Sequence, residues 1–230
     1  LFYSVPVRKG FLKSASTEFS HCHDLIQSLA LCHPQIGFTL LHNKKEILRV
    51  SSQVVSIDSE TIGEKSFRKR AIDILGKDLA GKLVYVHKDN KYGMIEALIS
   101  PPGIEKGSSK FMYTWVNGRW VKDKTLRYGI LRGYHSHLLK GKFPIVLMHF
   151  LTDPSLVDVN VHPSKTELRF QYGSEVQSFL SISLRESLRK GAWAAPDTPA
   201  MPTHDSVKGG ASKLPKDFDL TFGSESSPYS

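Results

Sequence analysis

The sequence of 230 residues contains little that marks a secreted, membrane-spanning or disulfide-stabilised protein. It has only two cysteines, Cys22 and Cys32, which are too few for a disulfide framework and fit a reducing cytoplasm. No stretch approaches the roughly 18 apolar residues that cross a bilayer, and the longest run, residues 145–151, contains His149. The first residues lack the basic-then-apolar pattern of a secretory signal. We therefore expect a cytoplasmic protein.

Common catalytic and metal-binding signatures are also missing. The sequence has no P-loop, no GxGxxG pattern, no nucleophile elbow and no constellation of paired carboxylates. A group of His and Cys side chains suggests a metal, but it contains neither a CxxC nor an HxxxH pair: His21, Cys22, His23, Cys32 and His33. Helical spacing places Cys22 in an apolar stripe between two outward-facing histidines. We expect a buried cysteine and solvated histidines, and no metal site.

Positive charge is what the sequence has in excess. The formal net charge is +9 and the isoelectric point is about 9.5. Residues 191–230 hold three Lys and five acidic residues, so residues 1–190 carry about +11. Such an excess on a folded body favours an anionic partner, of which nucleic acid is the commonest. A basic surface without a partner is the alternative.

Composition and spacing predict an α+β chain in two parts, followed by a linker. The hydrophobic content of 40% and the length suffice for one large domain or two small ones. Hairpins with a few helices, instead of regular βαβ units, favour α+β architecture. A short polar stretch near residues 56–64 separates a first part, 1–55, from a second, 62–190. Residues 191–230 lose apolar periodicity and are rich in Pro, Gly and Ser, which predicts the start of a flexible linker.

Apolar periodicity predicts the individual elements. Helices are expected at 16–32, 66–75, 123–139 and 174–189. Strands are expected at 1–5, 37–41, 46–51, 83–87, 92–100, 111–116, 145–151, 156–161 and 167–171. Asp123 is expected to cap the third helix. The exposed face of the second helix is expected to carry Arg68, Lys69 and Arg70.

The segment from Asp158 to Phe170 is the densest candidate for chemistry. It reads as a strand, a loop limited by Pro163, and a second strand, with Lys165 at the loop tip. A lysine is a compact charge on a long stem, suited to reach a phosphate on another surface. Spacing alone favours the other interpretation, an exposed loop lysine of no consequence.

A second candidate surrounds a predicted tight turn. Asn117-Gly118 between alternating residues is a strong hairpin signal, because a type I′ turn needs positive φ at both central positions. Arg119 and Lys122 follow the turn beside Trp120, and basic groups next to aromatic rings can bind a nucleic-acid backbone. A solvated hairpin edge that discourages strand addition explains them equally well.

Together with the opening residues, these segments resemble the MutL family of DNA mismatch repair proteins. Residues 1–13 are similar to the family's strand followed by N-x-P-A-R-x-K-F-L-K, and residues 116–123 match V-N-G-R-x-x-x-D. Residues 157–170 match V-D-V-N-V-H-P-x-K-x-E-V-R-F. Departures from these patterns are few: Ser4 for Asn, Val7 for Ala, Gly10 for Lys and Leu168 for Val.

The resemblance implies a fold and a set of site residues. Residues 1–55 would finish the sheet of a GHKL-type ATPase domain, and 62–190 would form the transducer domain also seen in type II topoisomerases. Lys165 would reach the γ-phosphate of ATP in the ATPase domain and act in its hydrolysis. Arg119 and Lys122 would lie where the family's groove meets DNA.

The resemblance also implies a larger protein around this chain, as does its start at Leu1 within an expected strand. The family's ATP-binding motifs lie upstream, and a C-terminal dimerisation domain, with a metal-dependent endonuclease motif in some members, lies beyond the linker. The full-length protein would be an ATPase that uses ATP and Mg, whereas this fragment alone would bind neither and be inactive. The location would be cytoplasmic, on the nucleoid if bacterial.

The expected partners follow from the same resemblance. They are DNA bound without regard to sequence, a mismatch-recognition protein of the MutS type, and a second copy of the full-length protein. Two other functions are open: a free-standing nucleic-acid-binding module, and the transducer of another GHKL ATPase such as a gyrase relative. The motif around Lys165 argues against both.

Overall fold

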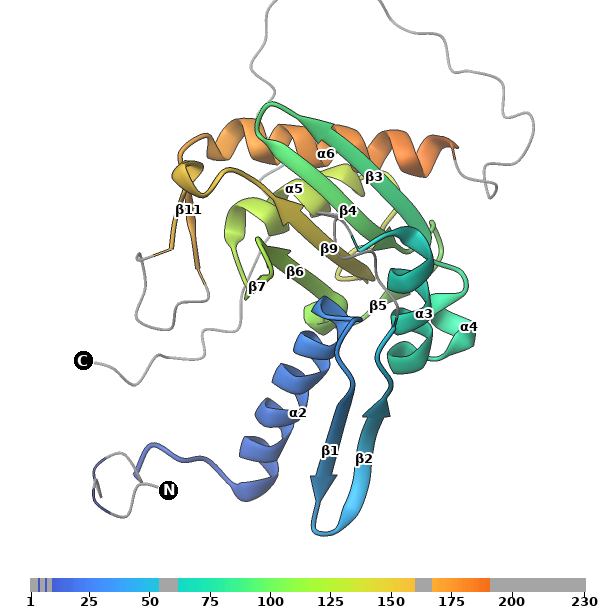
Figure 1. Cartoon of the computed structure of the whole chain (residues 1–230). Helices are drawn as coiled ribbons and strands as arrows, with labels where there is room; N and C mark the ends of the chain where they lie inside the picture. The colour runs from blue at the N-terminus through green and yellow to red at the C-terminus, as the bar shows by residue number, and fades with distance from the viewer. Residues whose placement is uncertain (1–3, 5–6, 8–9, 54–61, 160–166, 191–230) are drawn as a thin grey trace, which may run out of the picture. The chain divides into compact units, whose positions relative to one another are not determined.

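The structure is a computed structural model, and it describes residues 4, 7, 10–53, 62–159 and 167–190. All of the predicted opening strand except Ser4, most of the predicted boundary segment, the loop tip with Lys165, and the predicted linker 191–230 lie outside the described residues. Figure 1 shows the described elements as coloured ribbons.

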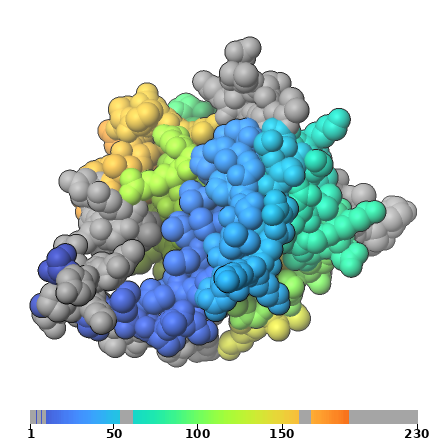
Figure 2. Space-filling model, turned by 60° about the horizontal axis from the view of Figure 1, so that its bottom comes forward, coloured from blue at the N-terminus to red at the C-terminus, as the bar shows by residue number. Residues whose placement is uncertain are grey.

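A long helix and a hairpin form the first group of elements. Helix α2 (Ala15–Cys32) begins after Ser14, whose hydroxyl accepts a hydrogen bond from the Thr17 amide at 3.2 Å. Strands β1 (Phe38–His42) and β2 (Lys45–Val50) pair through a two-residue turn, Asn43-Lys44, in which both residues have positive φ. The predicted helix and hairpin are confirmed. In Figure 2 the blue residues of these elements lie directly beside the teal residues of the following helix.

A five-stranded sheet forms the centre of the second group. Its order is β3-β4-β9-β6-β7, and every neighbouring pair is antiparallel except β6 and β9, which are parallel. The bounds are β3 Val84–Asn90, β4 Gly93–Ile99, β6 Met112–Val116, β7 Arg119–Val121 and β9 Val146–Leu151. The strands predicted at the positions of β3, β4, β6 and β9 are confirmed, and β7 follows the predicted Asn117-Gly118 turn.

The remaining elements surround this sheet. The helices are α3 (Glu64–Leu75), α4 (Lys77–Ala80), α5 (Lys124–Gly133) and α6 (Gly173–Lys190), with 3-10 turns η1 (Ser109–Phe111) and η2 (Pro154–Leu156). Two short strand pairs complete the described fold: β5 (Glu105–Lys106) with β8 (Phe143–Pro144), and β10 (Val157–Asp158) with β11 (Arg169–Phe170). Neither α4 nor the β5–β8 pair was predicted, because two to four residues leave no periodic signal.

Both faces of the sheet are covered, which explains the uninterrupted burial of β4 and β9. On one face Ile95, Ala97 and Ile99 pack with α5 and α6. On the other face Leu98 and Trp115 pack with α3 and with the last turn of α2. The two layers can be followed in Figure 1. The helix predicted at 174–189 is confirmed as α6, and four apolar residues at helical spacing are buried on one face: Val176, Leu180, Leu184 and Leu188.

Helix α5 is shorter than predicted. The expected helix continued to residue 139, but α5 ends at Gly133, and Leu138 beyond it is only partly buried. The buried Tyr134 hydroxyl donates a hydrogen bond to the Ser100 carbonyl at 2.6 Å, which ties the helix end to the end of β4. The chain then turns toward β8, whose pairing with β5 is not encoded in local periodicity.

Two glycines allow α5 and α6 to approach closely. A Cβ added at Gly129 would lie 2.9 Å from the Leu180 Cβ and 3.1 Å from the Gln177 carbonyl oxygen. A Cβ added at Gly133 would lie 3.0 Å from the Leu184 Cβ. Because these neighbours include backbone atoms and the first side-chain carbon, the helices themselves would have to move apart.

We expect Gly129→Ala to lower the free energy of unfolding by up to about 2 kcal/mol. Overpacking a core costs about 1–3 kcal/mol, which outweighs the roughly 1 kcal/mol that alanine gains over glycine inside a helix. Urea denaturation measures the change. Gly173→Ala is the control, because a Cβ there would meet only Thr125 at 3.8 Å and should cost little. Stabilisation by Gly129→Ala would show that α5 and α6 are not closely packed.

Arg70 corrects the predicted exposed face of α3. Its side chain is fully buried, whereas Arg68 is half-buried and Lys69 is exposed. The guanidinium donates hydrogen bonds of 2.7–2.8 Å to the carbonyls of Ala30, Pro34, Ile36 and Ser51. It thereby joins α3 to the end of α2 and to the base of the hairpin. The prediction was wrong because acceptors from distant segments compensate for burying this charge.

Glu96 and His149 are paired positions on β4 and β9, and both are buried. The Glu96 carboxylate accepts hydrogen bonds from the amides of Ile62 and Gly63 at 2.8 and 2.7 Å, at the start of α3. An anion at this end of a helix is stabilised by the unpaired amides and the helix dipole. Glu96 therefore fixes the point where the chain enters α3.

The His149 ring is stacked at 4.7 Å on Trp115, and burial lowers its pKa from 6.5 to about 3. The folded state thus binds this proton less readily than the unfolded state. As the pH falls below 6.5, protonation of this histidine in the unfolded chain lowers the free energy of unfolding. The loss should be about 1.4 kcal/mol per pH unit down to about pH 3. His149→Phe keeps the aromatic contact and should remove this part of the acid sensitivity. Urea denaturation between pH 7 and 4 tests it, and an equal pH slope in both proteins would contradict it.

Candidate nucleic-acid interface

The β6–β7 hairpin that carries Arg119 is held firmly in place. Its turn residues Asn117 and Gly118 have φ of 48° and 77°, which confirms the predicted two-residue turn. The Asn117 side chain donates to the Thr152 carbonyl and accepts from the Thr152 amide, both at 2.9 Å. The Cys32 thiol donates to the Gly118 carbonyl at 3.3 Å. The hairpin is therefore tied both to the end of β9 and to α2.

Arg119 begins the edge strand β7 and Lys122 directly follows its end, and the two side chains face different sides of the sheet. Arg119 is half-buried and pairs with Val116, whose side chain belongs to the α5–α6 side of the sheet. Trp120 pairs with Trp115 on the opposite side, and the exposed Lys122 extends its Nζ to 5.0 Å from the Trp120 ring centre. Strand alternation thus separates two cations that are close in sequence.

A cavity of about 190 Å³ lies beside Lys122, between the middle of α2, η1 and the start of α5. Three cations line it: Lys110, Lys122 and Arg127. Trp120 contributes an aromatic ring and Asp24 and Asp123 contribute carboxylates, whereas Arg119 is not part of the lining. Lys110 and Arg127 were not anticipated from sequence. Their convergence on one cavity depends on how η1 and α5 are placed by the fold, for which the sequence carries no local signal.

The start of α5 forms one wall of the cavity. The Asp123 carboxylate accepts a hydrogen bond from the Leu126 amide at 3.1 Å, so its predicted capping role is confirmed. Burial raises the pKa of Asp123, and hydrogen bonds from backbone amides oppose that rise. Burial also lowers the pKa of Arg127, whose guanidinium carbon lies 5.2 Å from the Phe143 ring centre. An anion that binds in the cavity would stabilise the charged form of this partly desolvated guanidinium.

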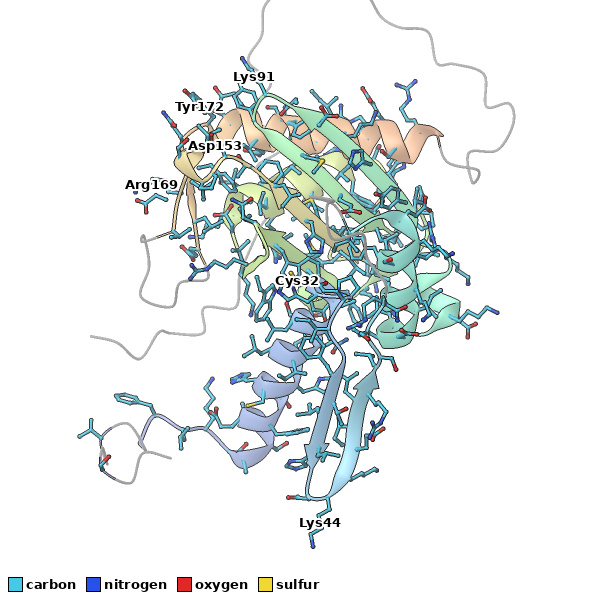
Figure 3. All side chains as sticks on the ribbon, in the orientation of Figure 1. Cys32, Lys44, Lys91, Asp153, Arg169 and Tyr172 are labelled. Atoms are coloured by element: carbon cyan, nitrogen blue, oxygen red, sulfur yellow. The ribbon has the colours of Figure 1, made fainter. Side chains whose placement is uncertain are left out.

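The loop that carries Lys165 begins and ends in described strands. Val157 pairs with Phe170 and Asp158 with Arg169, as the prediction of a strand–loop–strand unit requires. Phe170 is buried against Phe150, with ring centres 5.8 Å apart. Arg169 is labelled in Figure 3 on this stem. Lys165 itself lies outside the described residues, while the ends of its loop are anchored in the core beside β9.

The cysteine and histidine cluster shows one difference from its prediction. Cys22 is exposed and not buried, because only the last turn of α2 packs against the sheet. Cys32, labelled in Figure 3, lies at that contact, and burial raises its pKa to about 12. Among the described residues no three His, Cys, Asp or Glu side chains are placed to hold a metal ion. No helix in the described part of the chain is long and apolar enough to span a bilayer.

Comparison with known proteins gives a consistent result. A family model described as "DNA mismatch repair protein, C-terminal domain" matches residues 71–189. DNA mismatch repair protein MutL of Anoxybacillus flavithermus is 35% identical over 190 residues, covering 83% of this chain and 29% of the relative. MutL of Syntrophotalea carbinolica is 32% identical over 200 residues, covering 86% and 30%. The chain therefore spans under a third of the length of these curated relatives.

A solved structure shares the fold. The crystal structure of the N-terminal domain of a DNA repair protein superposes with a TM-score of 0.62 at 24% identity, over 82% of this chain and 59% of that one. At this identity the likeness concerns the fold alone, and it confirms the predicted α+β class.

Proposed function

Because the chain belongs to the family of MutL-type DNA mismatch repair proteins, we propose that it couples ATP binding and hydrolysis to DNA binding. Residues 1–55 complete the ATPase domain and residues 62–190 form the transducer. The observation that carries the proposal is the β10–β11 stem, which anchors both ends of the Lys165 loop in the sheet core. A change at the loop tip, where ATP is sensed, is thereby passed to β9 and to the hairpin that Asn117 ties to it.

Arg70 connects the two proposed parts of the chain. Its four carbonyl acceptors lie at the end of α2, in the following loop and after β2, whereas the arginine belongs to α3. The contact makes a stiff connection between the two proposed parts. In the full-length protein, ATP binding and hydrolysis are also coupled to dimerisation and to the recruitment of downstream repair factors, with a mismatch-recognition protein of the MutS type as one partner. The family match favours this function over a free-standing nucleic-acid-binding module and over a gyrase-type transducer.

DNA contact is assigned to the edge of the sheet. Arg119 and Lys122 project from an anchored hairpin on a chain whose first 190 residues carry a large positive excess. A phosphate backbone is a row of negative charges, so cations on both sides of an edge strand can follow it without reading its sequence. Binding of this kind releases counterions and weakens steeply as salt rises.

We expect the double variant Arg119→Glu with Lys122→Glu to bind DNA more weakly and to flatten the salt dependence by about one unit per lost contact. Fluorescence anisotropy of a labelled duplex over a salt series measures both quantities. The matched control is Lys44→Glu with Lys45→Glu, at the tip of the β1–β2 hairpin, where Figure 3 labels Lys44. An unchanged slope in the folded double variant would reassign Arg119 and Lys122 to a solvated hairpin edge.

A further inference from the structure

The cavity beside the β6–β7 hairpin has the composition of a ligand site and not of a packing defect. Its cations come from three separate elements: Lys110 from η1, Lys122 from the end of β7 and Arg127 from α5. Its wall includes the half-buried Trp120 ring, over which the Lys122 ammonium already lies. A ring face next to several cations suits a ligand that joins a flat group to a phosphate.

A nucleotide has this combination of groups, but its base must be free to enter. In duplex DNA the bases are stacked and paired, and placing one in a protein pocket costs a few kcal/mol for extrusion. An unpaired strand avoids this cost, and stacking of a base on an aromatic side chain is tolerant of sequence. At about 190 Å³ the cavity is far too small for a paired helix, whereas a single base can enter it.

We propose that this cavity is a subsite for one unpaired nucleotide of a DNA strand. Trp120 stacks against the base, and Lys110 and Arg127 hold the adjoining phosphate. The inference rests on the proposed DNA contact of this domain. It adds that the cavity distinguishes unpaired from paired DNA, which the contact alone does not. Arg119, which lies outside the cavity, contacts the backbone of paired and unpaired DNA alike.

The two carboxylates of the cavity refine the proposal. Asp123 is engaged as the cap of α5 through the Leu126 amide. Asp24 belongs to α2, and 47% of its side chain is exposed at the rim. A negative charge at that place opposes the phosphate. Removing it should therefore strengthen binding, whereas removing the charge of Lys110 should weaken it.

Fluorescence anisotropy with a labelled oligothymidylate and a blunt duplex of equal length provides the test. Lys110→Gln should weaken binding of the single strand about 3- to 10-fold and change duplex binding less than about twofold. Trp120→Leu keeps an apolar side chain but removes the stacking surface, and should weaken single-strand binding about fivefold or more. Asp24→Asn should tighten single-strand binding about two- to fivefold. Circular dichroism checks that each variant is folded.

The outcomes separate this inference from the proposed function. The subsite would be contradicted if Lys110→Gln lowered the affinity for both DNA forms equally, or if Asp24→Asn lowered the affinity for the single strand. Both positions lie at the surface, so these substitutions should not affect folding. Arg119→Glu should weaken both DNA forms, which tests the general contact. If Arg119→Glu weakens binding of both DNA forms while the cavity variants affect single-stranded and duplex DNA equally, only the subsite is wrong. If the unaltered protein binds neither DNA, the DNA contact and the subsite fail together.

Discussion

Lys165→Ala should slow steady-state ATP hydrolysis by about 30- to 1000-fold when the upstream ATPase domain is present. In the proposed mechanism the ammonium group touches the terminal phosphate and stabilises the negative charge that develops as the γ-phosphoryl leaves. Losing such a charge-assisted contact costs on the order of 2–4 kcal/mol of transition-state stabilisation. The measurement is turnover at saturating ATP and magnesium.

Two further measurements make this result specific. ADP affinity should change little in Lys165→Ala, because ADP lacks the phosphate in question. Lys82→Ala and Lys140→Ala, at exposed positions outside the recognised motifs, should retain turnover within about twofold. Turnover at the unaltered level in a folded Lys165→Ala protein would return Lys165 to the status of an ordinary loop lysine.

Arg70→Met should lower the free energy of unfolding by about 3–5 kcal/mol. Methionine fills much of the same volume, so the loss reports the hydrogen bonds and not a cavity. Four carbonyl oxygens lose a charged donor at once, and the acceptors at Ala30 and Pro34 are fully buried in that contact. Urea denaturation followed by circular dichroism measures the change.

The neighbouring lysine supplies the control. Lys69 is exposed and donates to the Gln53 side chain at 2.6 Å, so Lys69→Met should change stability by no more than about 0.5 kcal/mol. A loss below about 1 kcal/mol in Arg70→Met would mean that water reaches the freed carbonyls. In that case Arg70 would not be the stiff connection between the two proposed parts.

Local signals were sufficient for much of the fold. Asn117-Gly118 specifies its turn through backbone conformation alone, and Asp123 caps α5 through a side chain three residues from its donor. The apolar residues of α6 recur at helical spacing because one face of the helix is buried. Each of these features depends on residues that are neighbours in sequence, and for that reason each could be predicted.

Features that depend on distant residues could not be predicted in this way. Arg70 reads as a solvated cation until the acceptor at Ala30, 40 residues away, is known. Lys110 and Arg127 come from separate elements that only the fold brings to one cavity, so the sequence led to Lys122 but not to the cavity that it lines. Arg119 and Lys122 formed one candidate patch in sequence, yet the alternation of an edge strand divides them.

The place of β9 in the sheet determines the order in which the protein can be completed as it is synthesised. It lies between β4 and β6 but is the last of the five strands in the chain. Until it has left the ribosome, β3–β4 and β6–β7 are two separate hairpins, each with an open edge of unpaired amides and carbonyls. A nascent chain that stops before Val146 therefore has no way to join its halves and offers two edges for aggregation. Pairing across such a sequence separation is slow, so these edges stay exposed until β9 is inserted.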